Sequence, residues 1–223
     1  MNLLKTIALA SLLLGLIACE SPQNVEGNTF VGQQGDGVDD TEVQKLNQEA
    51  DLLLEQGKTK AARKLLFQSL ELEENKTTYN SLGIADQLDL NYPSAIAYYE
   101  KALAMDSNYV YARLNLARTY FESGNSEMGI RLNLQVIAAK ADSFTVGTAH
   151  LHITKIYVKL GDCGAAIHHH ELSKEILAGD VRTKEQLERN ARLIEKSCHT
   201  PEAKFKMWLK AHPGQGEMHD LSK

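Results

Sequence analysis

The chain has 223 residues, of which 24% are charged and only four are prolines. That length fits one or two domains, and the scarcity of proline favours helices. The formal charge at pH 7 is −5 and no basic stripe is present, so the sequence argues against a nucleic-acid groove.

Residues 1–18 have the composition of an export signal. Lys5 is their only charged residue, and the apolar run IALASLLLGLIA follows it. A charged start and a short apolar run are typical of secretory signal peptides, and the run is too short for a comfortable transmembrane helix. No later segment has the roughly 18 uninterrupted apolar residues of a membrane span.

Cys19 follows Leu16, Ile17 and Ala18, and these four residues resemble a bacterial lipobox. In proteins of that class, signal peptidase cuts before the cysteine, which then carries a diacylglycerol and usually a further acyl chain such as palmitate on its amine. Several acyl chains, at about 0.8 kcal/mol per buried CH₂, would hold the protein on a bilayer. The alternative interpretation is an ordinary secretory signal with a chance cysteine.

Glu20 follows this cysteine. Because an aspartate at that place is the inner-membrane retention signal of enterobacteria, the resemblance implies an outer-membrane lipoprotein that faces the periplasm. Residues 19–40 are rich in glycine, glutamine, asparagine and aspartate and have no periodic apolar face. They are predicted to form a flexible tether between the lipid and the folded part.

The stretch from Lys76 to Tyr109 predicts a helical hairpin around Asn91-Tyr92-Pro93. Apolar or small residues recur at intervals of three and four on both sides: Tyr79, Leu82, Gly83 and Ile84, then Ala95, Ile96, Tyr99, Ala102 and Leu103. Pro93 suits the first turn of the second helix. Neither helix is expected to be stable without a partner for its apolar face, so the hairpin should stack on others.

The same hairpin recurs along the chain. Two columns of mainly small residues flank a column of turn residues: Ala50, Gly83, Ala117 and Thr154; Gly57, Leu90, Gly124 and Gly161; Ala62, Ala95, Gly129 and Ala166. Units begin near Val43, Lys76, Val110 and Gly147, at steps of 33, 34 and 37 residues. A helix–turn–helix unit of about 34 residues resembles the tetratricopeptide-repeat family. The predicted fold is therefore all-α, a right-handed superhelical array of about four repeats (near 43–75, 76–109, 110–146 and 147–180).

Two segments modify this array. Ala138 to Thr145 (AAKADSFT) adds three residues before the fourth repeat, as a looser turn or as a displaced helix that bends the superhelix. Arg182 to Cys198 is predicted to form one more helix, which would cap an array spanning residues 41–198. Residues 199–223 are expected to be mostly disordered.

Cys163 and Cys198 are the cysteines besides the predicted lipidation site. An exported chain meets an oxidising compartment, in which cysteine pairs tend to close. In the array, a capping helix parallel to the first helix of repeat four would bring Cys198 beside the turn that contains Gly161 and Cys163. A disulfide is therefore predicted, and two buried free thiols are the alternative.

Five of the eight histidines fall in the fourth repeat: His150, His152, His168, His169 and His170. Imidazole is the commonest metal ligand, but consecutive histidines spread around a helix and no i, i+4 pair of the zinc-protease kind is present. Solvated or groove-lining histidines are predicted rather than a metal site. Because the sequence also lacks a Gly-rich phosphate loop, a nucleophile elbow and a paired acid motif, neither a cofactor nor enzyme activity is predicted.

The resemblance to tetratricopeptide-repeat proteins implies a binding surface. In that family the first helices of successive repeats line a concave groove that holds extended peptides or partner helices. By repeat position, the implied groove comprises Asn47, Asn80, Ile84, Tyr111, Leu114, Arg118, Phe121 and Lys155, with Asn115 beside them. Asparagine amides can donate to and accept from a peptide backbone. The lysine–asparagine set with which some members clamp a C-terminal carboxylate is missing.

These implications give one leading functional hypothesis. The chain would be a lipid-anchored scaffold that holds another envelope protein during pilus, secretion or cell-wall assembly, and no oligomeric state is implied. The pilotin-like lipoproteins of type IV pili resemble it in architecture but usually have six repeats. The alternatives are a histidine-rich, metal-binding envelope lipoprotein and a regulator that brings a lytic enzyme or peptidase to its substrate.

Overall fold

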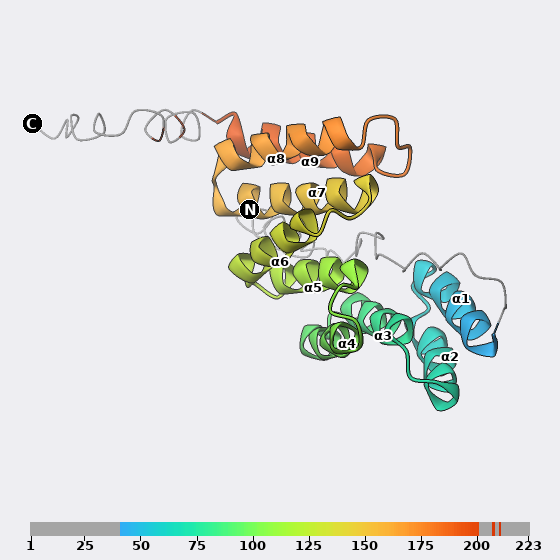
Figure 1. The fold of residues 1–223 in the computed structure, drawn as a ribbon. Helices are drawn as coiled ribbons and strands as arrows, with labels where there is room; N and C mark the ends of the chain where they lie inside the picture. The colour runs from blue at the N-terminus through green and yellow to red at the C-terminus, as the bar shows by residue number, and fades with distance from the viewer. Residues whose placement is uncertain (1–40, 201–206, 208–209, 211–223) are drawn as a thin grey trace, which may run out of the picture.

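The computed structural model describes residues 41–200, Met207 and Lys210. Within these residues the chain forms nine α-helices and no strand (Figure 1). Their bounds are α1 Glu42–Glu55, α2 Thr59–Leu72, α3 Lys76–Leu88, α4 Tyr92–Met105, α5 Val110–Glu122, α6 Ser126–Ala138, α7 Ser143–Leu160, α8 Cys163–Ile176 and α9 Lys184–Cys198. The predicted signal peptide, Cys19, the tether of residues 19–40 and most of the tail from residue 199 lie outside the described residues.

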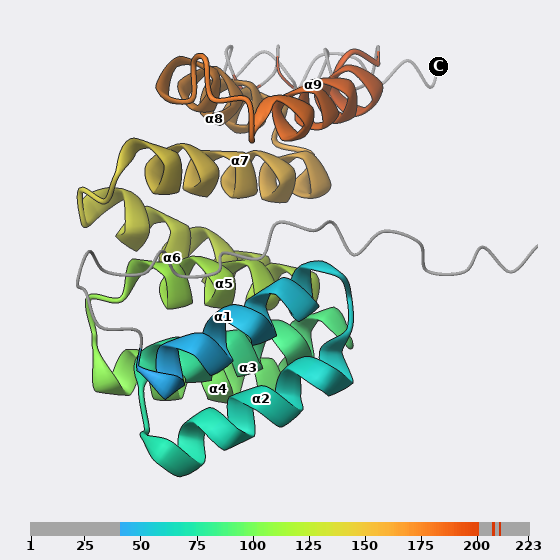
Figure 2. The same cartoon turned by 90° about the vertical axis from the view of Figure 1, so that its right-hand side faces the viewer.

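The helices pack as sequential pairs. α1 packs on α2, α3 on α4, α5 on α6 and α7 on α8, and α9 contacts both helices of the last pair. Figure 1 shows these pairs following one another from α1 and α2 at one end to α8 and α9 at the other, and Figure 2 shows α7 between α6 and the two helices α8 and α9. The predicted all-α array of four helix–turn–helix units with a capping helix is therefore confirmed.

Small side chains lie where helices of the array touch. Ala50, Ala62, Ala95, Ala117 and Ala166 are fully buried, as the repeat columns predict. At Gly83 the two helices come close together, because a Cβ atom there would lie 2.5 Å from Cε1 of the Tyr99 ring. Since real Cβ atoms do not come so near a ring, only glycine lets α3 and α4 pack at this distance.

The turn column marks four points at which the backbone becomes left-handed. Gly57, Gly124 and Gly161 have φ angles of 70°, 100° and 75°, and Leu90 has a φ angle of 60°. Glycine adopts this conformation freely, whereas a leucine adopts it with strain. The turns of repeats one, three and four are therefore relaxed, and the turn of repeat two is not.

Helix starts along the chain carry short polar side chains. The Thr41 side chain accepts from the Gln44 backbone N–H in a capping box, and Asn75, Asn125, Asp142 and Asp162 likewise each accept a hydrogen bond from a backbone N–H in the first turn. Such caps satisfy donors that have no partner inside the helix.

The three additional residues before repeat four lengthen a helix. α6 ends at Ala138, the chain turns at Lys140 with a φ angle of 52°, and α7 begins at Ser143, ahead of Gly147, where the repeat alignment places the start of the unit. Asp142 caps the added turn by accepting from the Thr145 backbone N–H at 3.0 Å. The expectation of a looser turn is therefore wrong, because the inserted residues extend α7 at its N-terminus.

The apolar core is uneven along the array. One cluster of buried residues runs without a break from Ala50 in α1 to Leu132 in α6. Two smaller clusters follow, one around Leu114, Val136 and Ala149 and one that joins Cys163 and Ala166 to α9. The N-terminal three repeats thus share a core that the last repeat does not extend.

Candidate protein-binding site

The first helices of the repeats form a row that α9 completes. α1 contacts α3, α3 contacts α5, α5 contacts α7, and α7 contacts α9. All nine side chains that the sequence assigns to the groove belong to this row. The structure buries six of them, Asn47, Asn80, Ile84, Leu114, Asn115 and Arg118, and leaves three half-buried, Tyr111, Phe121 and Lys155.

Two of the buried asparagines bond to each other between neighbouring helices of the row. Nδ2 of Asn115 in α5 donates to Oδ1 of Asn80 in α3 at 3.0 Å. Asn47 in α1 donates to Thr77 and accepts from Thr78 at the start of α3. These amides connect successive repeats, and their use in contacting a partner stays a prediction.

Three predicted groove residues converge on one pocket. Arg118 and Phe121 from α5 and Lys155 from α7 line a cavity of about 380 Å³, whose other wall comes from α9. The remaining lining residues are Glu122, Leu151, His152, Ile156, Val158, Lys159, Gln186, Leu193 and Ser197. We call it the α5–α7–α9 pocket. Its volume lies at the lower end of the roughly 300–1,000 Å³ that is usual for ligand sites.

The pocket is cationic although the chain is acidic. Arg118, Lys155 and Lys159 carry positive charge and Glu122 is the one carboxylate among the lining residues, which gives them a formal charge of +2 with a neutral His152. The whole chain has a formal charge of −5. The sign of the charge is thus reversed locally.

Glu122 is held at both of its oxygens. Nε of Arg118 donates to Oε1 at 2.7 Å, and Nε2 of Gln87 donates to Oε2 at 2.7 Å. The buried Tyr99 hydroxyl in turn donates to Oε1 of Gln87 at 2.9 Å. This chain of hydrogen bonds ties the pocket carboxylate to the core of repeat two and fixes its position.

His152 adds a neutral polar group to the pocket. Burial, and then the positive charges of Arg118 and Lys155, hold the pKa of His152 well below its usual value. The ring is half-buried as a whole, but its Nδ1 atom is covered and has no hydrogen-bond partner among the described residues. Buried polar atoms normally have a hydrogen-bond partner, so this covered nitrogen is an exception among the lining residues.

Phe121 and Lys159 form the exposed edge of the pocket. The Lys159 ammonium lies 5.0 Å from the centre of the Phe121 ring, a cation–π arrangement. This contact places a positive charge and an aromatic face side by side at the entrance.

Two histidines meet across repeat four, which spacing along one helix did not reveal. Nδ1 of His150 in α7 lies 2.8 Å from Nδ1 of His169 in α8, and Tyr157 stacks on the His169 ring. Burial, and then His150 and His168, lower the pKa of His169 to about 4. Among the described residues no group of three or more His, Cys, Asp or Glu side chains is placed to hold a metal ion.

Comparisons with known proteins agree with this arrangement. A family model described as a tetratricopeptide repeat matches residues 91–146, a segment that includes α4, α5 and α6. This segment of the chain is thus similar in sequence to tetratricopeptide repeats. Proteins built from these repeats generally act as scaffolds that bind other proteins. No curated protein matches the sequence.

Solved structures show the same fold at low sequence identity. A tetratricopeptide-repeat protein from Parabacteroides merdae aligns with a TM-score of 0.53 and 16% identity, over 78% of this chain and 68% of its own. A chain of the APC/C hetero-tetramer Cut9–Hcn1 aligns with a TM-score of 0.57 and 18% identity, over 67% of this chain and 30% of its own. This chain thus spans less than a third of the length of the second of these relatives.

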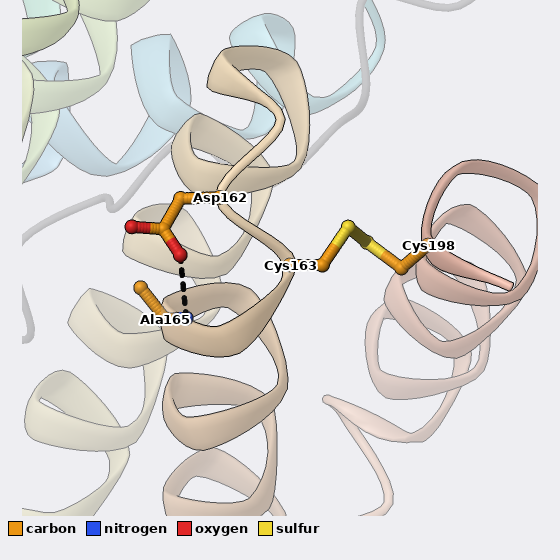
Figure 3. The surroundings of a disulfide bond; sticks show 4 residues. All are labelled: Asp162, Cys163, Ala165 and Cys198. Atoms are coloured by element: carbon orange, nitrogen blue, oxygen red, sulfur yellow. Dashed lines mark hydrogen bonds between the residues drawn. A yellow bond between two sulfur atoms is a disulfide. The ribbon is translucent and has the colours of Figure 1, made fainter. Parts of the chain in front are cut away.

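A disulfide fastens α9, the helix that forms the outer wall of the pocket. Cys163, the first residue of α8, is bonded to Cys198, the last residue of α9, with their Cα atoms 5.4 Å apart (Figure 3). Beside it, Asp162 caps α8 by accepting from the Ala165 N–H at 3.1 Å. Nδ2 of Asn190 also donates to the Leu151 carbonyl oxygen at 3.0 Å, so α9 is tied to both helices of repeat four.

No described helix of the repeat array is long and apolar enough to cross a bilayer.

Proposed function

We propose that the chain is a lipid-anchored scaffold of the bacterial envelope that binds another protein through the row of first helices. The observation that carries this proposal is the convergence of Arg118, Phe121 and Lys155 on the α5–α7–α9 pocket. Repeat position alone predicts these three residues as part of the groove, and they come from two repeats. The protein acts by binding and not by catalysis.

The envelope part of the proposal rests on two features of the sequence and one of the structure. Cys19 follows a lipobox-like Leu16-Ile17-Ala18, and Glu20 favours the outer membrane, with the array facing the periplasm. The Cys163–Cys198 bond suits an oxidising compartment. Within the envelope we place the scaffold in the assembly of a pilus, secretion or cell-wall complex, with the type IV pilus pilotin-like lipoproteins as the nearest architecture.

The anchor is tested by Cys19→Ser. The variant precursor should remain uncut by lipoprotein signal peptidase and should take up no labelled fatty acid. Labelling and membrane fractionation equal to those of the unsubstituted chain would overturn the anchor and leave partner binding untouched.

The binding face is tested by cross-linking in the native envelope followed by capture of the chain. Lys155→Glu should reduce recovery of the cross-linked partner, because it reverses a charge inside the pocket. Lys64→Glu is the matched control, since Lys64 makes the same charge change on the exposed face of the outer helix α2. Equal recovery with both variants would mean that the partner binds elsewhere, and no specific cross-link with any form would overturn the scaffold.

A histidine-based metal carrier is the second candidate function. It is favoured by the facing Nδ1 atoms of His150 and His169, although two imidazoles fall short of the three or four ligands of a usual zinc site. Equilibrium dialysis against Zn²⁺ and Cu²⁺ with metal analysis decides it. Binding in proportion to protein that disappears in His169→Asn would support the carrier, and no retained metal would dismiss it.

A further inference from the structure

The lining residues of the α5–α7–α9 pocket indicate which kind of ligand it can bind. Its lining is divided into two parts. Leu151, Ile156 and Leu193 give it an apolar floor and wall from α7 and α9, whereas Lys155 and Lys159 lie one turn apart on α7. A ligand that satisfies both parts has an apolar group next to an anionic one.

The fixed carboxylate of Glu122 restricts where the anion binds. Both of its oxygens already accept hydrogen bonds, from Arg118 and Gln87. Glu122 is therefore not poised to swing across the pocket and displace an incoming carboxylate from the lysines. Its own negative charge also disfavours an anion beside Arg118, so the favourable place for an anion is the Lys155–Lys159 side of α7.

His152 leaves the positive charge of the pocket to the basic side chains. Burial, and then the positive charges of Arg118 and Lys155, hold the pKa of His152 well below its usual value, so its ring is neutral. A bare anion would therefore gain only the charges of the α7 lysines. An extended segment of a protein partner would in addition place an adjacent side chain on the apolar part.

We propose that the α5–α7–α9 pocket recognises an internal acidic residue adjacent to an aromatic or large aliphatic residue in an extended segment of the protein partner. This inference rests on the proposed scaffold function and specifies the chemistry of the partner. The apolar side chain packs on Leu151, Ile156 and Leu193, and the carboxylate pairs with Lys155 and Lys159.

Fluorescence polarisation on the full-length chain in detergent tests the proposal. The probe is a fluorescein-labelled Gly/Ser peptide with one central Phe-Asp pair and an amidated C-terminus, so that a terminal carboxylate is absent. Matched peptides carry Phe-Asn, Phe-Lys or Ser-Asp. Since a hydrogen bond to a charged group is stronger than a neutral one, Phe-Asp should bind about tenfold more tightly than Phe-Asn, and Ser-Asp should also bind less tightly.

Charge reversal separates the pocket from the general charge of the protein. Lys159→Glu should remove the preference for Phe-Asp and favour Phe-Lys, and Lys64→Glu should leave the preference intact. Lys159 is exposed, so this variant should fold, and Lys155→Glu supplies an independent second test. Equal binding of Phe-Asp and Phe-Asn, or equal effects of Lys159→Glu and Lys64→Glu, would overturn the proposal.

Failure of this proposal is distinguishable from failure of the scaffold. A partner that is cross-linked in the envelope, together with peptides that bind without acidic preference, overturns the acidic-segment pocket and supports the scaffold. The absence of any specific cross-linked partner overturns the scaffold itself.

Discussion

The two ends of the array are held together in different ways. Repeats one to three share one continuous apolar cluster from Ala50 to Leu132. Repeat four and α9 have smaller clusters, and in addition a disulfide, the Asn190–Leu151 hydrogen bond and a pair of half-buried or buried histidines. A solenoid has only neighbour contacts to stabilise each unit. Where apolar burial becomes thin at the C-terminal end, covalent and polar contacts take over.

The disulfide should have the largest effect, and it should act at the C-terminal end. Cys163 and Cys198 are 35 residues apart in sequence. On the chain-entropy estimate, Cys163→Ser with Cys198→Ser should lower the free energy of unfolding by roughly 3–4 kcal/mol. Hydrogen exchange should show the loss of protection first in α9, with α1 to α4 little changed.

Thiol counting on the denatured, unreduced protein checks the bond itself. Cys163 and Cys198 should yield no reactive thiol before reduction and two after it. Two free thiols from these positions before reduction would contradict the view that the two ends are held together differently, because the C-terminal end would then lack its covalent contact.

Overpacking is the corresponding test at the N-terminal end. Gly83→Leu places a side chain against the Tyr99 ring, which a Cβ atom alone would approach to 2.5 Å. The free energy of unfolding should fall by roughly 1–3 kcal/mol, as measured by urea denaturation. Gly164→Leu in α8 is the matched control, because Gly164 is exposed and its nearest neighbour would be Asp162 Oδ1 at 3.6 Å. Equal losses would mean that the close contact between Gly83 and Tyr99 is not what makes the substitution destabilising.

Turn strain gives a smaller effect with the opposite sign. Leu90 has a φ angle of 60°, whereas Gly161 occupies the equivalent turn of repeat four with a φ angle of 75°. Leu90→Gly should raise the free energy of unfolding by roughly 0.5–1 kcal/mol, because relief of the left-handed strain exceeds the added freedom of the unfolded chain. Gly161→Ala should lower it. A Leu90→Ala variant should show no such gain, because alanine keeps the strain.

Most of the fold could be predicted from the sequence because each repeat is a local unit. The columns of small residues and of turn residues are short-range signals. The structure places the small residues Ala50, Ala62 and Gly83 in helix contacts and the turn residue Gly57 in a turn. The sequence did not predict that the three residues added before repeat four would lengthen α7, because a looser turn and an added helical turn require similar residues. Asp142 caps the longer α7 and was the available signal.

Less of the candidate site could be predicted, because it depends on contacts between repeats. Family position identified Arg118, Phe121 and Lys155 but not His152 or Lys159, which also line the pocket. Leu193 also lines the pocket, and it belongs to α9, which lies outside the repeats on which the family resemblance rests. The contact between His150 and His169 joins α7 and α8, so spacing along one helix could not predict it.

Acidification is expected to give the smallest change in stability that distinguishes the two ends of the array. Burial, opposed by a hydrogen bond from Ser81 and reinforced by Glu55, raises the pKa of Asp51 to about 7 from its usual 3.8. Between about pH 4 and pH 7 the folded chain therefore holds a proton at Asp51 that the unfolded chain has released. The contribution of Asp51 to the free energy of unfolding rises as the pH falls through this window.

His169 has the opposite sign at the other end of the array. Its pKa is lowered from 6.5 to about 4, by burial first and then by His150 and His168. Between about pH 4 and pH 6.5 the unfolded chain binds a proton at His169 that the folded chain does not bind. The contribution of His169 to the free energy of unfolding therefore falls as the pH falls. Lowering the pH from 7 to 5 should therefore raise the protection of α1 and α3 and reduce that of α7 and α8, in hydrogen exchange corrected for intrinsic rates. Asp51→Asn should abolish only the first change. His169→Asn should reduce only the second, because burial also lowers the pKa values of His150, His152 and His170 at that end. Parallel changes at both ends would show that these two groups do not control them.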